Sequence, residues 1–225
     1  VQQSFIAAED RRFYRHNGID GWGIARAVVT NVRQGSVREG ASTITQQLAR
    51  TVFLSQDRTI TRKLKEAALA LKLERQLSKQ QILEQYLNYV YLGSGAYGVA
   101  DAAWIYFSKT PDQLTLPEAA LIAGLPPAPS IYSPLVNPDL ALKQRAVVLD
   151  RMKQEGFITA GEAAQALNTP LNLQPATPKY FNSAAPFFTS WVAQELPKLV
   201  TQEQLEVGGL LSLIHISEPT RPYWI

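Results

Sequence analysis

Two glutamates lie where an ordinary surface carboxylate is not expected, and Glu9 is the first of them. It follows Phe5 by four residues and precedes Phe13 by four, so a helix through this segment places its carboxylate inside an apolar stripe. Burial there disfavours the charged form and raises the pKa toward a value that suits a general base. The alternative is a carboxylate at the edge of the stripe, paired with Arg12 or with a neighbouring helix, and spacing alone favours that ordinary ion pair.

The second glutamate is Glu66, which follows Arg62 and Lys63 in the segment RKLKE. Arg62 could hold a diphosphate through its planar fork, and Lys63 could hold it as a point charge. Glu66 would then orient the two cations, or bind a divalent cation that bridges to phosphate. An ordinary salt bridge within one helix explains the same residues without a ligand.

The segment GASTITQQ brings hydroxyl and amide side chains to the start of a predicted helix. Backbone amides at a helix N-terminus are a natural site for phosphate or sugar oxygens. Thr43 and Gln46 also form a capping-box pattern, which accounts for both residues without any ligand. The segment is therefore a candidate oxygen-binding site with a purely structural alternative.

Helical patterns fill the first two thirds of the chain, whereas alternating strand patterns are few. The sequence therefore predicts a mostly α fold. Side chains suited to helix capping predict helix starts at Ser4, Thr43, Thr59, Ser78 and Thr159. The helix that carries Glu66 is expected to bury five apolar residues on its inner face: Ile60, Leu64, Ala67, Ala68 and Leu71.

The distribution of proline and of helical periodicity divides the chain into three parts. Residues 1–167 are predicted to form the main domain, and residues 168–211 a proline-rich linker followed by a helix. Residues 212–225 have neither pattern and predict a disordered or non-native tail. Within the main domain, approximately residues 18–40 mix apolar side chains with arginines and glycines, as an interfacial lobe would.

Composition limits the chemistry further. The net charge of +3 is too small to indicate nucleic acid, although a weakly basic surface suits anionic lipid. The chain has no cysteine and only two histidines, so a thiolate metal site is excluded and zinc chemistry is not expected. No apolar run approaches the roughly 20 residues of a membrane-spanning helix.

Five segments in order resemble the motifs of the family 51 glycosyltransferases, the polymerase domains of class A penicillin-binding proteins. They are EDRRFYRHNGID, GASTITQQLAR, RKLKE, KQQILEQYLNYVYLGSGAYGV and AAWIYFSK. Salt bridges and helix caps that arise independently would not reproduce this ordered series. The resemblance implies a lysozyme-like, mostly α fold with a large head lobe and a small apolar jaw that dips into the membrane surface, matching residues 18–40.

The same resemblance implies polymerisation of lipid II into β-1,4-linked glycan strands, at the outer face of the bacterial cytoplasmic membrane. Glu9 would be the general base of an inverting single displacement, and Glu66 would act on the side of the leaving diphosphate. The expected cofactor is a divalent cation, Mg or Mn, which Glu66 would help to position. The family's other matching positions are expected to bind or support substrate: Asp10, Phe13, His16, Ser42, Thr43, Gln47, Arg50, Arg62 and Lys63. Expected partners are lipid II, the growing glycan, the membrane surface and cell-wall synthesis proteins, without nucleic acid.

The sequence also departs from the family pattern. The family's N-terminal membrane anchor is not in it, and after Gly208-Gly209-Leu210 it ends in SLIHISEPTRPYWI, where relatives continue toward a transpeptidase domain. We therefore expect a chain truncated at both ends. The competing hypotheses are a lysozyme-like lytic enzyme, a catalytically silent cell-wall binding module and, more distantly, a helix-turn-helix nucleic-acid binder.

Overall fold

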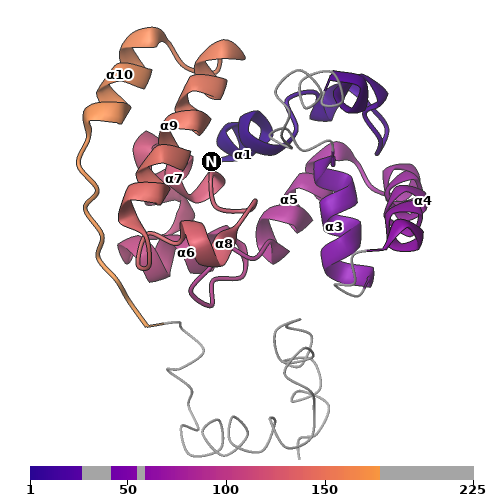
Figure 1. The fold of residues 1–225 in the computed structure, drawn as a ribbon, viewed down its shortest axis with the longest axis horizontal. Coiled ribbons are helices and arrows are strands. Elements are labelled where there is room, and N and C mark those ends of the chain that lie inside the picture. Colours follow the sequence, from indigo (N-terminus) through magenta and orange to yellow (C-terminus); the bar gives the residue numbers. More distant parts are fainter. Residues whose placement is uncertain (27–41, 55–58, 178–225) are drawn as a thin grey trace, which may run out of the picture. The chain divides into compact units, whose positions relative to one another are not determined.

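The computed structural model describes residues 1–26, 42–54 and 59–177, and within these ranges the chain is helical with no strand (Figure 1). Its elements are α1 (Gln2–Glu9), η1 (Phe13–Arg15), α3 (Ile44–Phe53), α4 (Ile60–Gln76), α5 (Lys79–Tyr89), α6 (Gly98–Phe107), η2 (Pro111–Gln113), α7 (Leu116–Ala123), α8 (Pro129–Tyr132), α9 (Pro138–Gln154) and α10 (Ala160–Asn168). The predicted mostly α fold class is confirmed. Most of the predicted jaw lies outside the described residues; its described part includes a helical turn at residues 21–26.

Local capping determines where several helices begin. Thr43 and Gln46 form the predicted capping box at the start of α3, and equivalent boxes precede α5 and α10. The Thr59 side chain accepts a hydrogen bond from the Arg62 backbone amide at the start of α4. Ser4 was a wrong prediction of a cap, because α1 already begins at Gln2 and Ser4 is buried within it.

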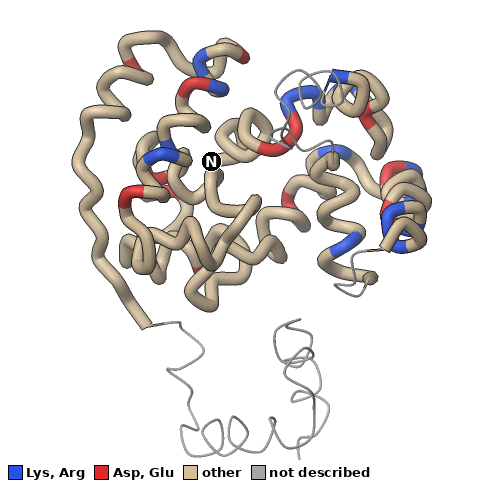
Figure 2. Tube along the Cα trace, viewed as in Figure 1, with Lys and Arg blue, Asp and Glu red and all other residues tan. Residues whose placement is uncertain are grey.

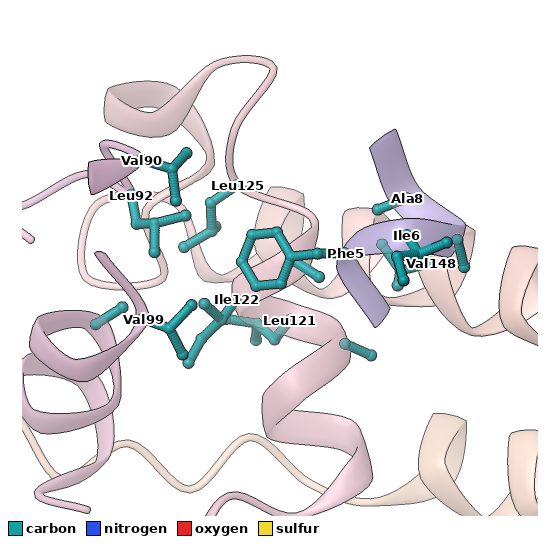
Figure 3. Packing of buried hydrophobic residues seen from close by; sticks show 14 of the residues in the cluster. Phe5, Ile6, Ala8, Val90, Leu92, Val99, Leu121, Ile122, Leu125 and Val148 are labelled. Carbon is teal, nitrogen blue, oxygen red and sulfur yellow. The ribbon is translucent and has the colours of Figure 1, made fainter. Parts of the chain in front are cut away.

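The hydrophobic core holds α1 in place. Phe5 and Ile6 are buried against apolar residues of neighbouring helices, as α1 packs on both α7 and α9 (Figure 3). The Phe5 ring also meets the Tyr86 ring of α5 edge to face, with centroids 6.1 Å apart. These contacts fix the C-terminal end of α1, where Glu9 lies.

A second group of contacts brings α3 and α4 to the same end of α1. α3 packs against both α4 and α5, and α5 also packs against α6. Gly18 lies against α4 with φ +88°, and a Cβ there would approach the Ala70 backbone to 3.0 Å. The Gly18 carbonyl accepts a 2.6 Å hydrogen bond from the Thr43 hydroxyl, so this close approach also anchors the start of α3.

The buried face of α4 differs from the prediction. Ile60 and Leu64 are 84% and 68% exposed, whereas Glu66 and Ala70 are buried. Figure 2 shows acidic and basic residues in close succession along this helix. The predicted inner face of α4 was wrong because hydrophobicity did not decide which face of the helix is buried. The buried face carries Glu66, which pairs with Arg62 and Lys63. It also carries the small Ala70, which lies against Gly18.

Residues 169–177 run in an extended conformation along α6. The backbone amides of Gln174 and Ala176 donate to the carbonyls of Tyr106 and Ile105 at 2.9 and 3.1 Å. Leu171 packs against the hydrophobic core. The remainder of the predicted 168–211 linker, and the whole 212–225 tail, lie outside the described residues.

No helix among the described residues is both long enough and apolar enough to cross a membrane.

Candidate active site

A cavity of about 310 Å³ opens beside Glu9, at the C-terminal end of α1. The start of α3 forms another part of its wall, the loop after α7 contributes prolines, and α9 contributes Arg151. Its lining is strongly polar and includes several arginines. The full lining consists of Ala8, Glu9, Asp10, Arg11, Asp20, Gly23, Arg26, Ser42, Thr43, Gln47, Arg50, Pro126, Pro127 and Arg151.

The Glu9 carboxylate accepts a hydrogen bond from a side chain of α3. The Gln47 Nε2 amide donates to Glu9 Oε2 at 2.7 Å, and the Tyr86 hydroxyl donates to Gln47 Oε1 at 3.2 Å, which fixes the amide's orientation. Burial raises the pKa of Glu9, while the Gln47 hydrogen bond and the charges of Arg151 and Arg50 oppose this rise. A carboxylate whose proton affinity is increased in this way is suited to accept a proton from a hydroxyl group.

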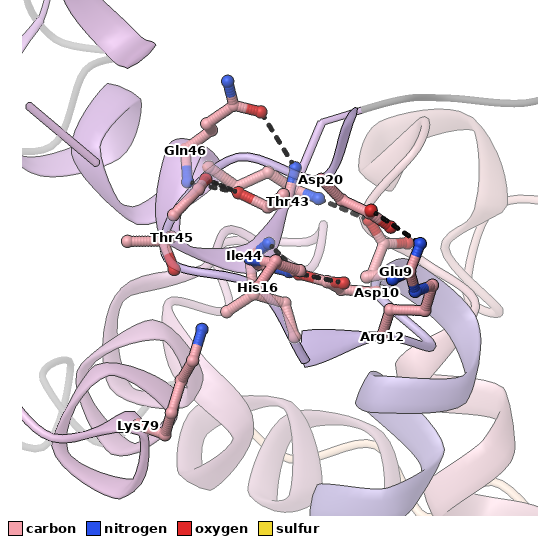
Figure 4. Close-up of polar contacts among 12 residues, drawn as sticks. Glu9, Asp10, Arg12, His16, Asp20, Thr43, Ile44, Thr45, Gln46 and Lys79 are labelled. Atoms are coloured by element: carbon pink, nitrogen blue, oxygen red, sulfur yellow. Dashed lines mark hydrogen bonds and ion pairs between the residues drawn. The ribbon is translucent and has the colours of Figure 1, made fainter. Parts of the chain in front are cut away.

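Asp10 connects α1 to the start of α3. One of its oxygens accepts a 3.0 Å hydrogen bond from the Ile44 backbone amide, and the same carboxylate lies 2.9 Å from His16 Nε2 (Figure 4). Asp10 and His16 are both buried. The pair therefore locks the end of α1 onto the N-terminus of α3, which holds Glu9 and Gln47 in register.

Glu66 is almost fully buried, and both of its carboxylate oxygens are paired. Arg62 Nη1 lies 2.5 Å from Oε1, and Lys63 Nζ lies 2.9 Å from Oε2. Lys63 Nζ also donates to Ser42 Oγ at 2.6 Å, and Ser42 lines the Glu9 cavity. The cationic cluster Arg62, Lys63 and Glu66 is thus joined to the edge of that cavity through a single hydroxyl.

A metal ion near Glu66 would need ligands from outside the protein side chains. The described residues contain no group of three His, Cys, Asp or Glu side chains that could hold a metal ion among themselves. Mg²⁺ is commonly bound by one or two carboxylates together with substrate phosphates and water. Glu66 offers a single carboxylate for binding of that kind, and both of its oxygens already accept hydrogen bonds from Arg62 and Lys63.

The structure brings some of the predicted site residues together and separates others. Six of them line the Glu9 cavity: Glu9, Asp10, Ser42, Thr43, Gln47 and Arg50. Arg62, Lys63 and Glu66 adjoin it through Ser42 without lining it. Phe13 is completely buried beneath Lys79, whose Nζ lies 4.4 Å from the ring centroid, so its side chain supports the site from behind. His16 likewise acts through Asp10.

Sequence reasoning missed Arg151. Its Nη1 donates to the Ala8 carbonyl at 2.5 Å, and its charge favours the ionised form of Glu9. It belongs to α9, far from Glu9 along the chain, and no local pattern in its helix distinguishes it from the other basic residues there. Only the packing of α1 against α9 places it in the cavity wall.

Comparisons with known proteins agree on one family. A family model described as transglycosylase matches residues 1–153. Penicillin-binding protein 1A of Neisseria meningitidis serogroup A is 51% identical over 196 residues, which are 87% of this chain and 24% of that protein. Penicillin-binding protein 1A of Aquifex aeolicus is 51% identical over 174 residues, 77% of this chain and 24% of that protein.

A crystal structure of penicillin-binding protein 1A from Haemophilus influenzae matches at 42% identity and a TM-score of 0.45, over 56% of this chain and 18% of that one. The chain thus spans 24% of the length of the curated relatives quoted above. The family model covers more than half of the chain and includes Glu9, the start of α3 and the Glu66 cluster. The chain belongs to the transglycosylase family.

Proposed function

We propose that this chain is a peptidoglycan glycosyltransferase that polymerises lipid II into β-1,4-linked glycan strands. Membership of the transglycosylase family supports the reaction class. The observation that carries the proposal is the setting of Glu9, a carboxylate of raised pKa oriented by Gln47 in the wall of a cavity rich in arginine.

In the proposed reaction, Glu9 takes the proton from the 4-hydroxyl of the acceptor sugar. The acceptor oxygen attacks the donor's anomeric carbon, and the bond from that carbon to the lipid diphosphate breaks. The diphosphate leaves with the bonding electrons. This single displacement inverts an α-linked donor into a β-linked product, so it requires a base on one side and positive charge on the other.

The leaving diphosphate would be stabilised at the cluster of Arg62, Lys63 and Glu66. Lys63 contacts Ser42 at the cavity edge, so its ammonium can reach a phosphate bound there. Arg62 has a buried Nε without a hydrogen-bond partner among the described residues, which leaves donor capacity beyond its bond to Glu66. A divalent cation, Mg or Mn, would supply further charge neutralisation when bound to Glu66 and to phosphate oxygens.

These cations favour polymerisation over a lytic activity. Hydrolysis of a glycosidic bond releases no diphosphate, so it gives no role to a cationic cluster at the cavity edge. We further propose that the reaction takes place at the outer face of the cytoplasmic membrane, where the growing glycan and cell-wall synthesis proteins would be the partners.

The test is polymerisation of labelled lipid II in detergent with a divalent cation, followed by separation of the products on a gel. Glu9→Gln is expected to form no polymer, because its neutral amide cannot accept the proton. Glu84→Gln, which changes an exposed glutamate on α5, is the matched control and should retain the parent's activity. Normal polymer formation by a folded Glu9→Gln variant would refute the role of Glu9, and shortening of preformed glycan by the parent would favour the lytic hypothesis.

A further inference from the structure

A second cavity, of about 280 Å³, lies between the start of α7, α9 and the extended residues 169–174. It shares no lining residue with the Glu9 cavity. Its lining residues are Phe107, Lys109, Thr115, Pro117, Glu118, Arg145, Thr169, Pro170, Leu171, Asn172 and Gln174. The mechanism proposed above makes no use of any of them.

Arg145 is the distinctive residue of this second cavity. It is 5% exposed, and its one protein hydrogen bond among the described residues runs from Nη2 to the Leu167 carbonyl at 3.0 Å. Its Nε is buried without any hydrogen-bond partner there. Burial lowers the pKa of the guanidinium, although it remains charged at neutral pH. Of the five N–H donors of this guanidinium, one bonds to the Leu167 carbonyl and the buried Nε–H has no partner among the described residues.

Glu118 lines the same cavity, but its carboxylate forms its hydrogen bonds with groups other than Arg145. Both Glu118 oxygens accept from Lys109 Nζ, at 2.7 and 2.9 Å, and Glu118 Oε2 also accepts from the Thr115 backbone amide at 2.8 Å. Lys109 and Glu118 cancel each other's charge, so the lining retains the single positive charge of Arg145. An uncompensated buried charge is costly, and a bound anion would compensate it.

We propose that this cavity binds a small carboxylate, with the Arg145 guanidinium as its anchor. A planar fork of N–H donors matches the two oxygens of a carboxylate. Asn172 and Gln174 line the same cavity and carry amide groups that can donate to the ligand. A monoanion is favoured over phosphate because the lining offers only one unpaired positive charge, that of Arg145. The carboxylate can belong to a free acid or to the C-terminus of a peptide.

The first arm of the test is a calorimetric titration of the chain with N-acetylalanine, with its neutral amide and with inorganic phosphate. Saturable binding of N-acetylalanine is expected, and its amide should bind at least tenfold more weakly because it lacks the charge. Absence of saturable carboxylate binding, equal binding of the amide, or preferential binding of phosphate would each overturn the proposal. Acetyl-alanyl-alanine identifies the source: tighter binding than N-acetylalanine indicates a peptide terminus, and weaker binding a free acid.

The second arm uses variants. Arg145→Gln should weaken binding of N-acetylalanine at least tenfold, whereas Arg75→Gln, at an exposed arginine on α4, should not. Because Arg145→Gln can also destabilise α9, Asn172→Phe provides an independent check: it keeps Arg145 and obstructs the cavity from an exposed position. Undiminished binding by a folded Arg145→Gln or Asn172→Phe protein contradicts the site.

Discussion

Replacement of Gln47 by leucine tests whether this side chain acts through Glu9. The change keeps a side chain of similar size and removes the amide that donates to Glu9 Oε2 at 2.7 Å. That hydrogen bond stabilises the charged carboxylate and opposes the rise in pKa caused by burial. Its removal should therefore raise the pKa of Glu9 further, so that the base becomes protonated at a higher pH.

The magnitude follows from the type of hydrogen bond. A hydrogen bond to a charged group contributes about 1.5–3 kcal/mol, which corresponds to roughly a 10- to 100-fold change in the proton equilibrium. On the acid side of the pH profile, kcat/KM for lipid II should fall by about this factor, and activity should recover as the pH rises. The Tyr86 hydroxyl also loses its acceptor, which costs about 1–3 kcal/mol of folding stability.

The assay is kcat/KM for lipid II measured across pH, for the parent, Gln47→Leu and a control. Gln85→Leu makes the same chemical change at an exposed position of α5 and should leave the profile unchanged. Thermal unfolding monitors the stability of each variant separately. If Gln47→Leu lowers the rate uniformly at every pH, with the acid limb in its original position, then Gln47 contacts substrate but does not tune Glu9.

Two further predictions concern the diphosphate side and the core. Glu66→Gln should lower kcat for lipid II by about 100-fold or more, because Arg62 and Lys63 lose the charge that orients them; parent-like turnover in a folded protein would exclude this role. Phe5→Ala should cost about 3–5 kcal/mol of unfolding free energy in a urea titration, because Phe5 is fully buried. Phe53→Ala, at a residue that is 56% exposed, should cost well under about 1 kcal/mol, and an equal loss in both variants would contradict the importance of burial.

Much of the fold and part of the site could be predicted from local sequence. The start of α3 needed only Thr43 and Gln46, because a capping box forms between residues three apart. The apolar stripe around Glu9 suggested a desolvated carboxylate as one of two possibilities, although spacing alone favoured an ordinary ion pair. In the structure Phe5 and Phe13 are both buried, and burial raises the pKa of Glu9. The ordered motifs likewise identified the family without any knowledge of three-dimensional contacts.

The face buried by α4 could not be predicted in the same way. Hydrophobic periodicity favoured Ile60 and Leu64, yet α4 buries Glu66 and Ala70. Ion pairs stabilise the charge on Glu66, and the absence of a side chain at Gly18 permits the close approach to Ala70. Both effects depend on which groups face each other across an interface, and a one-dimensional pattern does not contain that information.

By itself, the sequence determined the family and the helix starts that rest on local caps, and it indicated the two candidate glutamates. The tertiary structure decided which groups meet them: Arg151 reaches the wall beside Glu9 because α1 packs on α9, and Lys63 reaches the cavity edge through Ser42. Caps arise between residues a few positions apart, whereas burial and charge pairing join residues that only packing makes neighbours. The electrostatic environment that gives a carboxylate its chemistry is therefore a property of the folded chain.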